Sequence, residues 1–245
     1  MRQSLSYSAF RFLVSVFFAI SLTGCAIATQ PQRPSPQKPS PTATAAEQQP
    51  TSDAIDRPTS KPYTGDLSRF EDPKRDQNLQ VNRVMDILGI KQGSNVADIG
   101  AGSGWFTVRA ARRVETAGVV YAVEINPDYL KHIEARAERE KLPNIKTILG
   151  QEDDPRLPNQ SVDAVLLLKT YHEVAQPIRL LKRTREAMRT GALLGIIDRE
   201  GEDDDHGIEK EIVIKEASSA GFTLVDEYDF VKPDNVDYFL VFRAK

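Results

Sequence analysis

Three glycines alternate with small residues in the sequence VADIGAGSGWFT, residues 96–107. A strand-like apolar run with one acid, Asp98, leads into Gly100, Gly102 and Gly104. In a mainly parallel sheet, the loop from a strand to the next helix lies at the carboxyl edge, where such sheets bind ligands. A Cβ at any of the three glycines would intrude on a ligand or force an unfavourable turn. The stretch therefore predicts a loop whose backbone closely approaches a ligand.

Strand and helix patterns alternate through the rest of the chain. Strand-like runs occur at residues 94–100, 118–125, 144–149, 161–169, 191–198, 222–230 and 236–244, and helical patterns at 77–90, 103–114, 126–142, 176–188 and 207–221. Apolar strands that alternate with helices predict a mainly parallel sheet covered on both faces. The last two strands have no helix between them and should form a hairpin, so one runs antiparallel. We predict an α/β, Rossmann-like seven-stranded mixed sheet.

An acid ends the second predicted strand, at Glu124, twenty residues after Gly104. An acid at this point accepts hydrogen bonds from ribose hydroxyls, which predicts an adenosine-type ligand. The dinucleotide fingerprint G-x-G-x-x-G does not fit, because Trp105 stands where its third glycine would be. We expect Trp105 to pack its helix against the sheet.

Four segments together resemble class I S-adenosylmethionine-dependent methyltransferases. They are VADIGAGSGWFT, VYAVEINPDYL, LGQEDDPRLPNQSVDAVLLL and LKRTREAMRTGALLGIID, and the resemblance covers roughly residues 70–245. It implies S-adenosylmethionine as cofactor and methyl transfer as the reaction. The residues it implies at the cofactor are Asp98, the three glycines, Glu124, Lys169, and Asp153 as the adenine contact with Glu152 as the alternative.

The sequence KTYHEV, residues 169–174, follows the fourth predicted strand at the same edge of the sheet. His172 is the candidate catalytic residue, because a base is needed if the acceptor must lose a proton. The alternative, which we favour, is that His172 orders the loop or lines the acceptor pocket, because methyl transfer depends mainly on positioning. Tyr171 is a candidate wall of that pocket. Phe70 and Arg75 are candidates for a lid.

We expect no metal site. The sequence EDDDHG, residues 202–207, could hold a divalent ion, but no second ligand cluster has suitable spacing, so it is interpreted as a solvated acidic loop. The sole cysteine, Cys25, excludes an internal disulfide and a thiolate metal cluster.

The first 62 residues differ in composition from the rest. Residues 1–24 have the layout of a secretory signal, and the ending LTGC resembles the lipobox of bacterial lipoproteins, which implies lipidation at Cys25. Residues 25–62, rich in Pro, Gln, Ser and Thr, are predicted to form a disordered tether to a methyltransferase domain at 63–245. We therefore expect an exported lipoprotein of the bacterial cell envelope, with the lipid anchor as its membrane contact.

Several functions fit these features. The expected acceptor is a small molecule or an accessible protein side chain; a net charge of −3 without a basic stripe argues against nucleic acid. One alternative is a non-catalytic module that binds an adenosine-type ligand. It gains weight because S-adenosylmethionine is a cytoplasmic metabolite and an exported enzyme would need a supply of it. A nicotinamide-dependent oxidoreductase is disfavoured by the glycine spacing.

Overall fold

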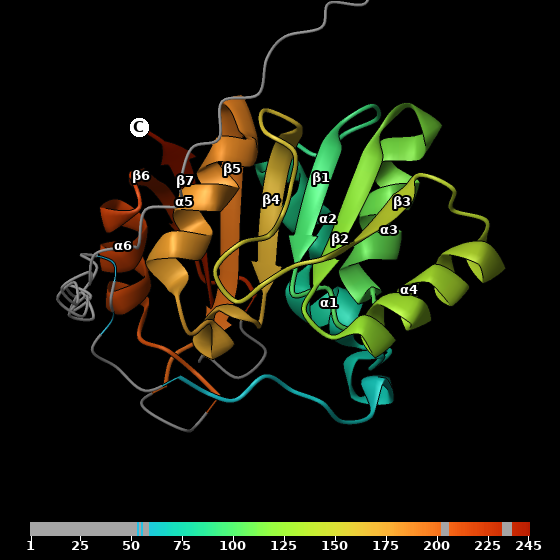
Figure 1. Ribbon diagram of the computed structural model, residues 1–245, viewed down its shortest axis with the longest axis horizontal. Helices are drawn as coiled ribbons and strands as arrows, with labels where there is room; N and C mark the ends of the chain where they lie inside the picture. Colours follow the sequence, from blue (N-terminus) through green and yellow to red (C-terminus); the bar gives the residue numbers. More distant parts are fainter. Residues whose placement is uncertain (1–52, 54, 56–58, 202–205, 232–236) are drawn as a thin grey trace, which may run out of the picture. The chain divides into compact units, whose positions relative to one another are not determined.

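The computed structural model describes residues 53, 55, 59–201, 206–231 and 237–245 (Figure 1). The predicted signal peptide, Cys25 and most of the predicted tether lie outside the described residues. No helix among the residues described is both long enough and apolar enough to cross a membrane.

The described chain forms one seven-stranded sheet. Its order is β3-β2-β1-β4-β5-β7-β6. Strands β1 to β5 are parallel, and β7 runs antiparallel to both β5 and β6. This confirms the predicted mixed sheet with its antiparallel C-terminal hairpin. The strands are β1 (Asn95–Ile99), β2 (Val119–Glu124), β3 (Ile145–Leu149), β4 (Val162–Leu168), β5 (Met188–Arg199), β6 (Phe222–Tyr228) and β7 (Asp237–Ala244).

Helices cover both faces of the sheet, as predicted (Figure 1). One face packs against α1 to α3 and the opposite face against α5 and α6, while α4 packs on β2 and β3. The helices are α1 (Arg75–Leu79), α2 (Val81–Ile87), α3 (Trp105–Val114), α4 (Pro127–Glu140), α5 (Pro177–Ala187) and α6 (Lys210–Ser219), with 3-10 turns η1 (Leu67–Phe70), η2 (Glu115–Ala117) and η3 (Tyr171–Glu173).

Consecutive residues of the central strands belong to different cores. In β1, Val96 lies in the core under α1 to α3, and Ala97 lies in the core under α5 and α6. Successive side chains of a strand point to opposite faces, so a strand covered on both faces must be apolar throughout. This is why the strands appear in the sequence as continuous apolar runs.

The first predicted helix, residues 77–90, is divided in the structure. Gln80 adopts a left-handed conformation with φ 46°, and separates α1 from α2. Leu79 and Val81 are both buried. Two residues that are two positions apart point in nearly opposite directions in a continuous helix, so the break at Gln80 allows both to reach the core.

The carboxyl ends of β1, β2, β4 and β5 meet at one edge of the sheet, toward the bottom of Figure 1. The segment before η1 passes below these strand ends. At the end of β2, the Asn126 side chain accepts a hydrogen bond from the Asp128 amide at 2.9 Å, which caps α4 ahead of Pro127 at its first position. Polar residues from several strand ends gather at this edge.

Candidate functional site

A cleft of about 690 Å³ opens at the carboxyl edge of the sheet. Its volume is within the range of small-molecule sites, which is about 300–1,000 Å³. The loops after β1, β2, β3, β4 and β5 line it, together with residues 59–64 and the region around η1 and α1. The predicted residues that line it are Asp98, Gly100, Gly102, Glu124, Glu152, Lys169, His172, Phe70 and Arg75.

The glycine loop is held in a conformation that side chains rarely adopt. Gly100, Gly102 and Gly104 have φ values of 75°, 54° and 75°. A Cβ at Gly100 would come within 2.2 Å of Thr170 Cγ2, whereas a Cβ at Gly102 would meet only the Phe70 ring, at 3.8 Å. Gly104 precedes α3 as its N-cap residue. Gly100 is therefore required by packing between strand ends, and Gly102 leaves open space on the cleft side.

Glu124 connects the end of β2 to the glycine loop. One carboxylate oxygen accepts from the Gly102 amide at 3.0 Å, and the other accepts from the Ile125 and Asn126 amides at 2.8 and 3.2 Å. A carboxylate offers about four acceptor positions. Oε2 therefore keeps a position for a ligand hydroxyl, and Glu124 lines the cleft.

Asp98 is buried at the base of the loop. Its Oδ2 accepts a hydrogen bond from the Thr107 hydroxyl of α3 at 2.6 Å. Burial raises the pKa of the Asp98 carboxyl to about 6, although Thr107 and the charge of Arg75 act in the opposite direction. A carboxylate here carries a charge that the protein alone stabilises poorly, as expected for a group that faces a cationic ligand.

The raised pKa of Asp98 predicts a pH-dependent stability. Because the folded pKa exceeds the ordinary value of 3.8, the contribution of this group is fully present below about pH 4 and is lost as the pH rises through about 6. The unfolding free energy of the parent minus that of Asp98→Asn should fall by about 3 kcal/mol between about pH 4 and pH 7, because the parent loses this contribution. Urea unfolding of both proteins at several pH values measures it. A difference independent of pH would contradict this assignment.

One of the two acids predicted at the adenine contact lies away from the cleft. Asp153 does not line the cleft, since its side chain forms an ion pair with Arg179 of α5 at 2.6 Å. Gln151 and Glu152 line the cleft instead. The loop after β3 folds back on itself through the Gln151–Asp154 bridge, which turns successive side chains in different directions. Glu152, the alternative in the sequence, is thus the one of these two acids that lines the cleft.

His172 is held firmly by a residue that the sequence analysis did not single out. Its backbone amide donates to Asp198 Oδ2 at 3.1 Å, and its Nδ1 lies 2.8 Å from Asp198 Oδ1. Burial alone would lower the pKa of His172, but the hydrogen bond and charge of Asp198 outweigh burial and raise it. Asp198 lies near the carboxyl end of β5 and is fully buried. Glu124 was identified because it is an acid at the carboxyl end of a strand, and the same criterion would have identified Asp198.

Glu173 is a second cleft residue that was missed. Its Oε1 accepts from the Tyr63 amide at 3.3 Å and lies 3.9 Å from His172 Nε2. Burial raises the pKa of Glu173 to about 7. Its neighbour Tyr171 was predicted to be a pocket wall, but it is not among the residues that line this cleft. The Tyr171 side chain is fully buried in the core, where its hydroxyl donates to Glu216 at 2.9 Å.

Lys169 lies at the end of β4 and lines the cleft. It adopts a left-handed conformation with φ 57°, and its amino group forms an ion pair with Asp237 of β7. The pair fixes the lysine side chain across the strand ends, so its cationic group is already partly neutralised at the cleft.

The segment before β1 closes one side of the cleft. Arg75 donates to the Phe70 carbonyl at 2.8 Å, and its guanidinium lies over the Trp105 ring at 4.5 Å. Trp105 is buried in the core under α1 to α3, where it also borders the cleft. Residues 59–64 line the cleft as well, and the Ser60 amide donates to the His172 carbonyl at 3.2 Å. Phe70 and Arg75, the lid candidates, are thus anchored to α3.

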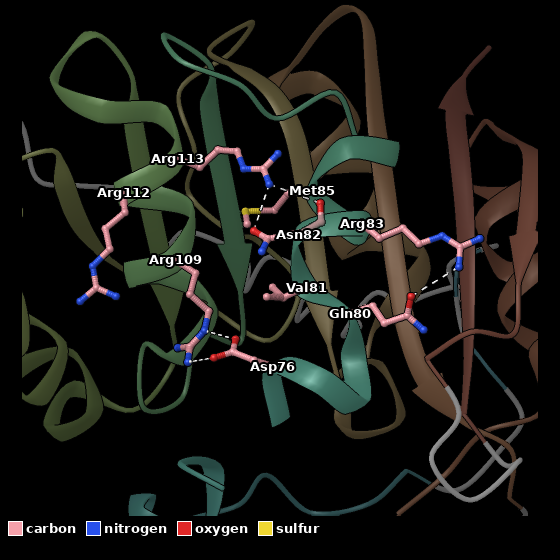
Figure 2. A pocket seen from close by; sticks show the side chains of 9 residues that line it. All are labelled: Asp76, Gln80, Val81, Asn82, Arg83, Met85, Arg109, Arg112 and Arg113. Carbon is pink, nitrogen blue, oxygen red and sulfur yellow. Dashed lines mark hydrogen bonds and ion pairs between the residues drawn. The ribbon is translucent and has the colours of Figure 1, made fainter. Parts of the chain in front are cut away.

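A second groove, of about 740 Å³, lies between α2 and α3 (Figure 2). It is rich in arginine, and three of these guanidinium groups pair with carboxylates, whereas Arg83 contacts the Gln80 side-chain oxygen and the Phe230 ring. Arg109 donates to Asp76 at 2.7 Å, Arg113 pairs with Asp86, and Arg112 pairs with Glu140 at 2.6 Å. These charges are satisfied within the described chain, so we assign no ligand to this groove.

The region from β1 to the start of β5 resembles a known family. Residues 96–191 match the family model described as "Methyltransferase domain". This segment is therefore similar to methyltransferase domains. It includes the glycine loop, the acid at the end of β2 and the turn that contains His172.

Curated relatives match this chain only in part. Protein-L-isoaspartate O-methyltransferase of Pyrococcus horikoshii is 30% identical over 95 residues, which are 39% of this chain and 42% of that protein. An uncharacterized methyltransferase of Mycobacterium bovis is 34% identical over 102 residues, which are 42% of this chain and 38% of that protein. The chain spans less than half of the length of these relatives.

Solved structures resemble more of the chain. A SAM-dependent methyltransferase from Aquifex aeolicus has a TM-score of 0.66 at 22% identity, and the likeness covers 73% of this chain and 98% of that one. The [4+2]-cyclase SpnF has a TM-score of 0.60 at 14% identity, over 78% of this chain and 88% of that one. The described chain thus has the Rossmann-like methyltransferase fold, which the cyclase shares.

Proposed function

We propose that this chain is an S-adenosylmethionine-dependent methyltransferase that acts on a small molecule or an accessible protein side chain. The observation that carries the proposal is the glycine loop, whose open backbone faces a cleft beside Glu124 and Asp98. The family match and the fold agree with it.

The residues at this end of the cleft suit the cofactor. The loop at Gly102 leaves space that a Cβ would occupy, Glu124 keeps an acceptor position for a ribose hydroxyl, and buried Asp98 offers a charge for the methionine amine. Glu152 lies in the same cleft and is our choice for the adenine side. When bound, S-adenosylmethionine supplies an electrophilic methyl group on a sulfonium.

The acceptor belongs at the other end of the same cleft, near His172 and Glu173. Asp198 holds the imidazole by its Nδ1, so the ring has one orientation and presents Nε2 toward Glu173. A fixed ring is suited to positioning an acceptor, and positioning supplies much of the catalysis in a displacement of this kind. We therefore assign His172 to the acceptor pocket.

A binding module that keeps the fold without methyl transfer is the second candidate. It is favoured by the [4+2]-cyclase, which shares the fold and has another activity. Fold alone does not fix a reaction. The two functions differ in product: a methyltransferase releases S-adenosylhomocysteine in the presence of its acceptor, whereas a binding module does not.

We further propose that the full chain is an exported lipoprotein, on the strength of the LTGC ending and the charged start of its N-terminal sequence. The lipid on Cys25 would then be the membrane contact. S-adenosylmethionine is made in the cytoplasm, so an exported enzyme would have to receive it from there.

The cofactor assignment is tested by calorimetric titration of the full chain. We expect saturable binding of S-adenosylmethionine and of S-adenosylhomocysteine. At a hundredfold excess over its dissociation constant, either compound should raise the free energy of unfolding by about 2.7 kcal/mol. Nicotinamide dinucleotide should give no heat. Binding of the dinucleotide without binding of either adenosyl compound would overturn the proposal.

A further inference from the structure

Two of the chain's three histidines meet Glu173 at the acceptor end of the cleft. The ring centroids of His172 and His206 are 6.0 Å apart. One potential ligand atom from each of the three side chains lies within 4.8 Å of the other two. His172 and Glu173 follow β4, and His206 follows β5, the neighbouring strand. The pairing of β4 with β5 therefore brings the three side chains together.

The orientation of His172 is the one that metal-binding histidines have. A ligating imidazole usually donates its other ring N–H to a carboxylate, which fixes the tautomer and the plane of the ring. Here Nδ1 lies 2.8 Å from Asp198 Oδ1, and Nε2 lies 3.9 Å from Glu173 Oε1. Asp198 also accepts from the His172 backbone amide, so the supporting carboxylate is itself fixed.

We propose that His172, Glu173 and His206 bind a divalent transition-metal ion of the zinc type. Two imidazole nitrogens and one carboxylate oxygen suit zinc and related ions, whereas magnesium and calcium prefer oxygen ligands. Ligand atoms around tetrahedral zinc are about 3.3 Å apart, given bonds of about 2.0–2.1 Å. The three ligand atoms lie within 4.8 Å of one another, and the exposed His206 side chain can rotate to bring its nitrogen closer to the other two.

The proposed ion site differs from the expectation that the chain binds no metal. The loop at 202–207 alone offered no second group of ligands at a suitable sequence spacing. The second group is instead His172 and Glu173, which precede His206 by more than thirty residues and are brought near it by the pairing of β4 with β5.

Three protein ligands leave an open coordination position, as in catalytic zinc sites. That position lies in the cleft shared with the glycine loop. A metal ion there would bind an acceptor hydroxyl or thiol and lower its pKa, so that the acceptor loses its proton to solvent and reacts as an anion. The new bond from the acceptor to the methyl carbon would form as the bond from that carbon to the sulfonium sulfur breaks, and S-adenosylhomocysteine would leave. This use of the ion rests on the proposed methyl transfer, whereas ion binding itself does not.

The test is a titration of the full chain, prepared without a polyhistidine tag and stripped with a chelator, with Zn²⁺ by calorimetry and with Co²⁺ by visible absorption. Because ligation must displace protons, the titration is done at about pH 8. We expect one equivalent of each ion to bind. His206→Ala and Glu173→Gln should each weaken binding at least tenfold.

His132 supplies the matched control, because it is the remaining histidine and is exposed on α4 outside the cleft. His132→Ala should bind both ions as the parent does, and the melting temperature of His206→Ala should equal that of the parent. Absence of saturable binding in the parent, or equal binding by His206→Ala, would refute the site. The titration contains no adenosyl compound, so its outcome is independent of the cofactor test.

Discussion

Replacing Gly102 with valine should abolish binding of S-adenosylmethionine while the fold largely persists. The residue has φ 54°, which a β-branched side chain tolerates poorly, and its Cβ would project into open space beside Phe70 at 3.8 Å. The fold has room for the added atoms, but a cofactor cradled by the loop does not. We expect a loss of affinity of at least about a hundredfold, which corresponds to about 2.7 kcal/mol, measured by calorimetry.

Gly89→Val is the matched control for the backbone strain. Gly89 has φ 68°, a Cβ added to it would meet nothing within 4 Å, and it lies outside the cleft. Both variants should lose a similar amount of stability, on the order of 1–3 kcal/mol, from the left-handed conformation. Only Gly102→Val should lose the cofactor. Undiminished binding by that variant would mean that the glycines serve the turn alone and that the site is elsewhere.

Replacing Cys25 with serine should abolish lipid attachment completely. Expressed in a bacterium, the parent chain should partition with membranes and incorporate labelled fatty acid, because Cys25 is its sole cysteine and follows Leu22, Thr23 and Gly24. The Cys25→Ser variant has no thiol to modify. Metabolic labelling followed by fractionation measures both effects.

Two results would contradict the export proposal separately. Label retained by Cys25→Ser would place the lipid on another residue. An unprocessed parent chain that is soluble in the cytoplasm would refute the signal peptide, and it would also remove the question of how an exported enzyme obtains S-adenosylmethionine. Cofactor binding by the domain is independent of both results.

The fold could be predicted because each central strand is a mainly apolar run in the sequence. Val96 and Ala97 belong to different cores, and both had to be apolar, so burial on two faces is visible in the sequence. The division of the first helix was not predictable in this way. A helical pattern gives the residues of one face, and it does not show that Leu79 and Val81 must both be buried.

The site was predictable where the residue position relative to a strand end decides the role. Gly102 and Glu124 meet through a hydrogen bond, as residues that end or follow adjacent parallel strands should. Tyr171 and Asp153, which were predicted to line the site, lie outside the cleft for another reason. In a short irregular turn, neighbouring side chains diverge, so Tyr171 enters the core while His172 faces the cleft. The turn conformation depends on tertiary contacts such as that of His172 with Asp198.

Trp105 gives the protein a built-in optical probe. It is the only tryptophan in the sequence, and it borders the cleft directly after the glycine loop. The guanidinium groups of Arg75 and Arg109 lie 4.5 and 3.9 Å from the centre of its ring. Its emission therefore comes from a single known environment, and any ligand that shifts the loop or Arg75 can be followed by the intrinsic fluorescence of the unlabelled protein.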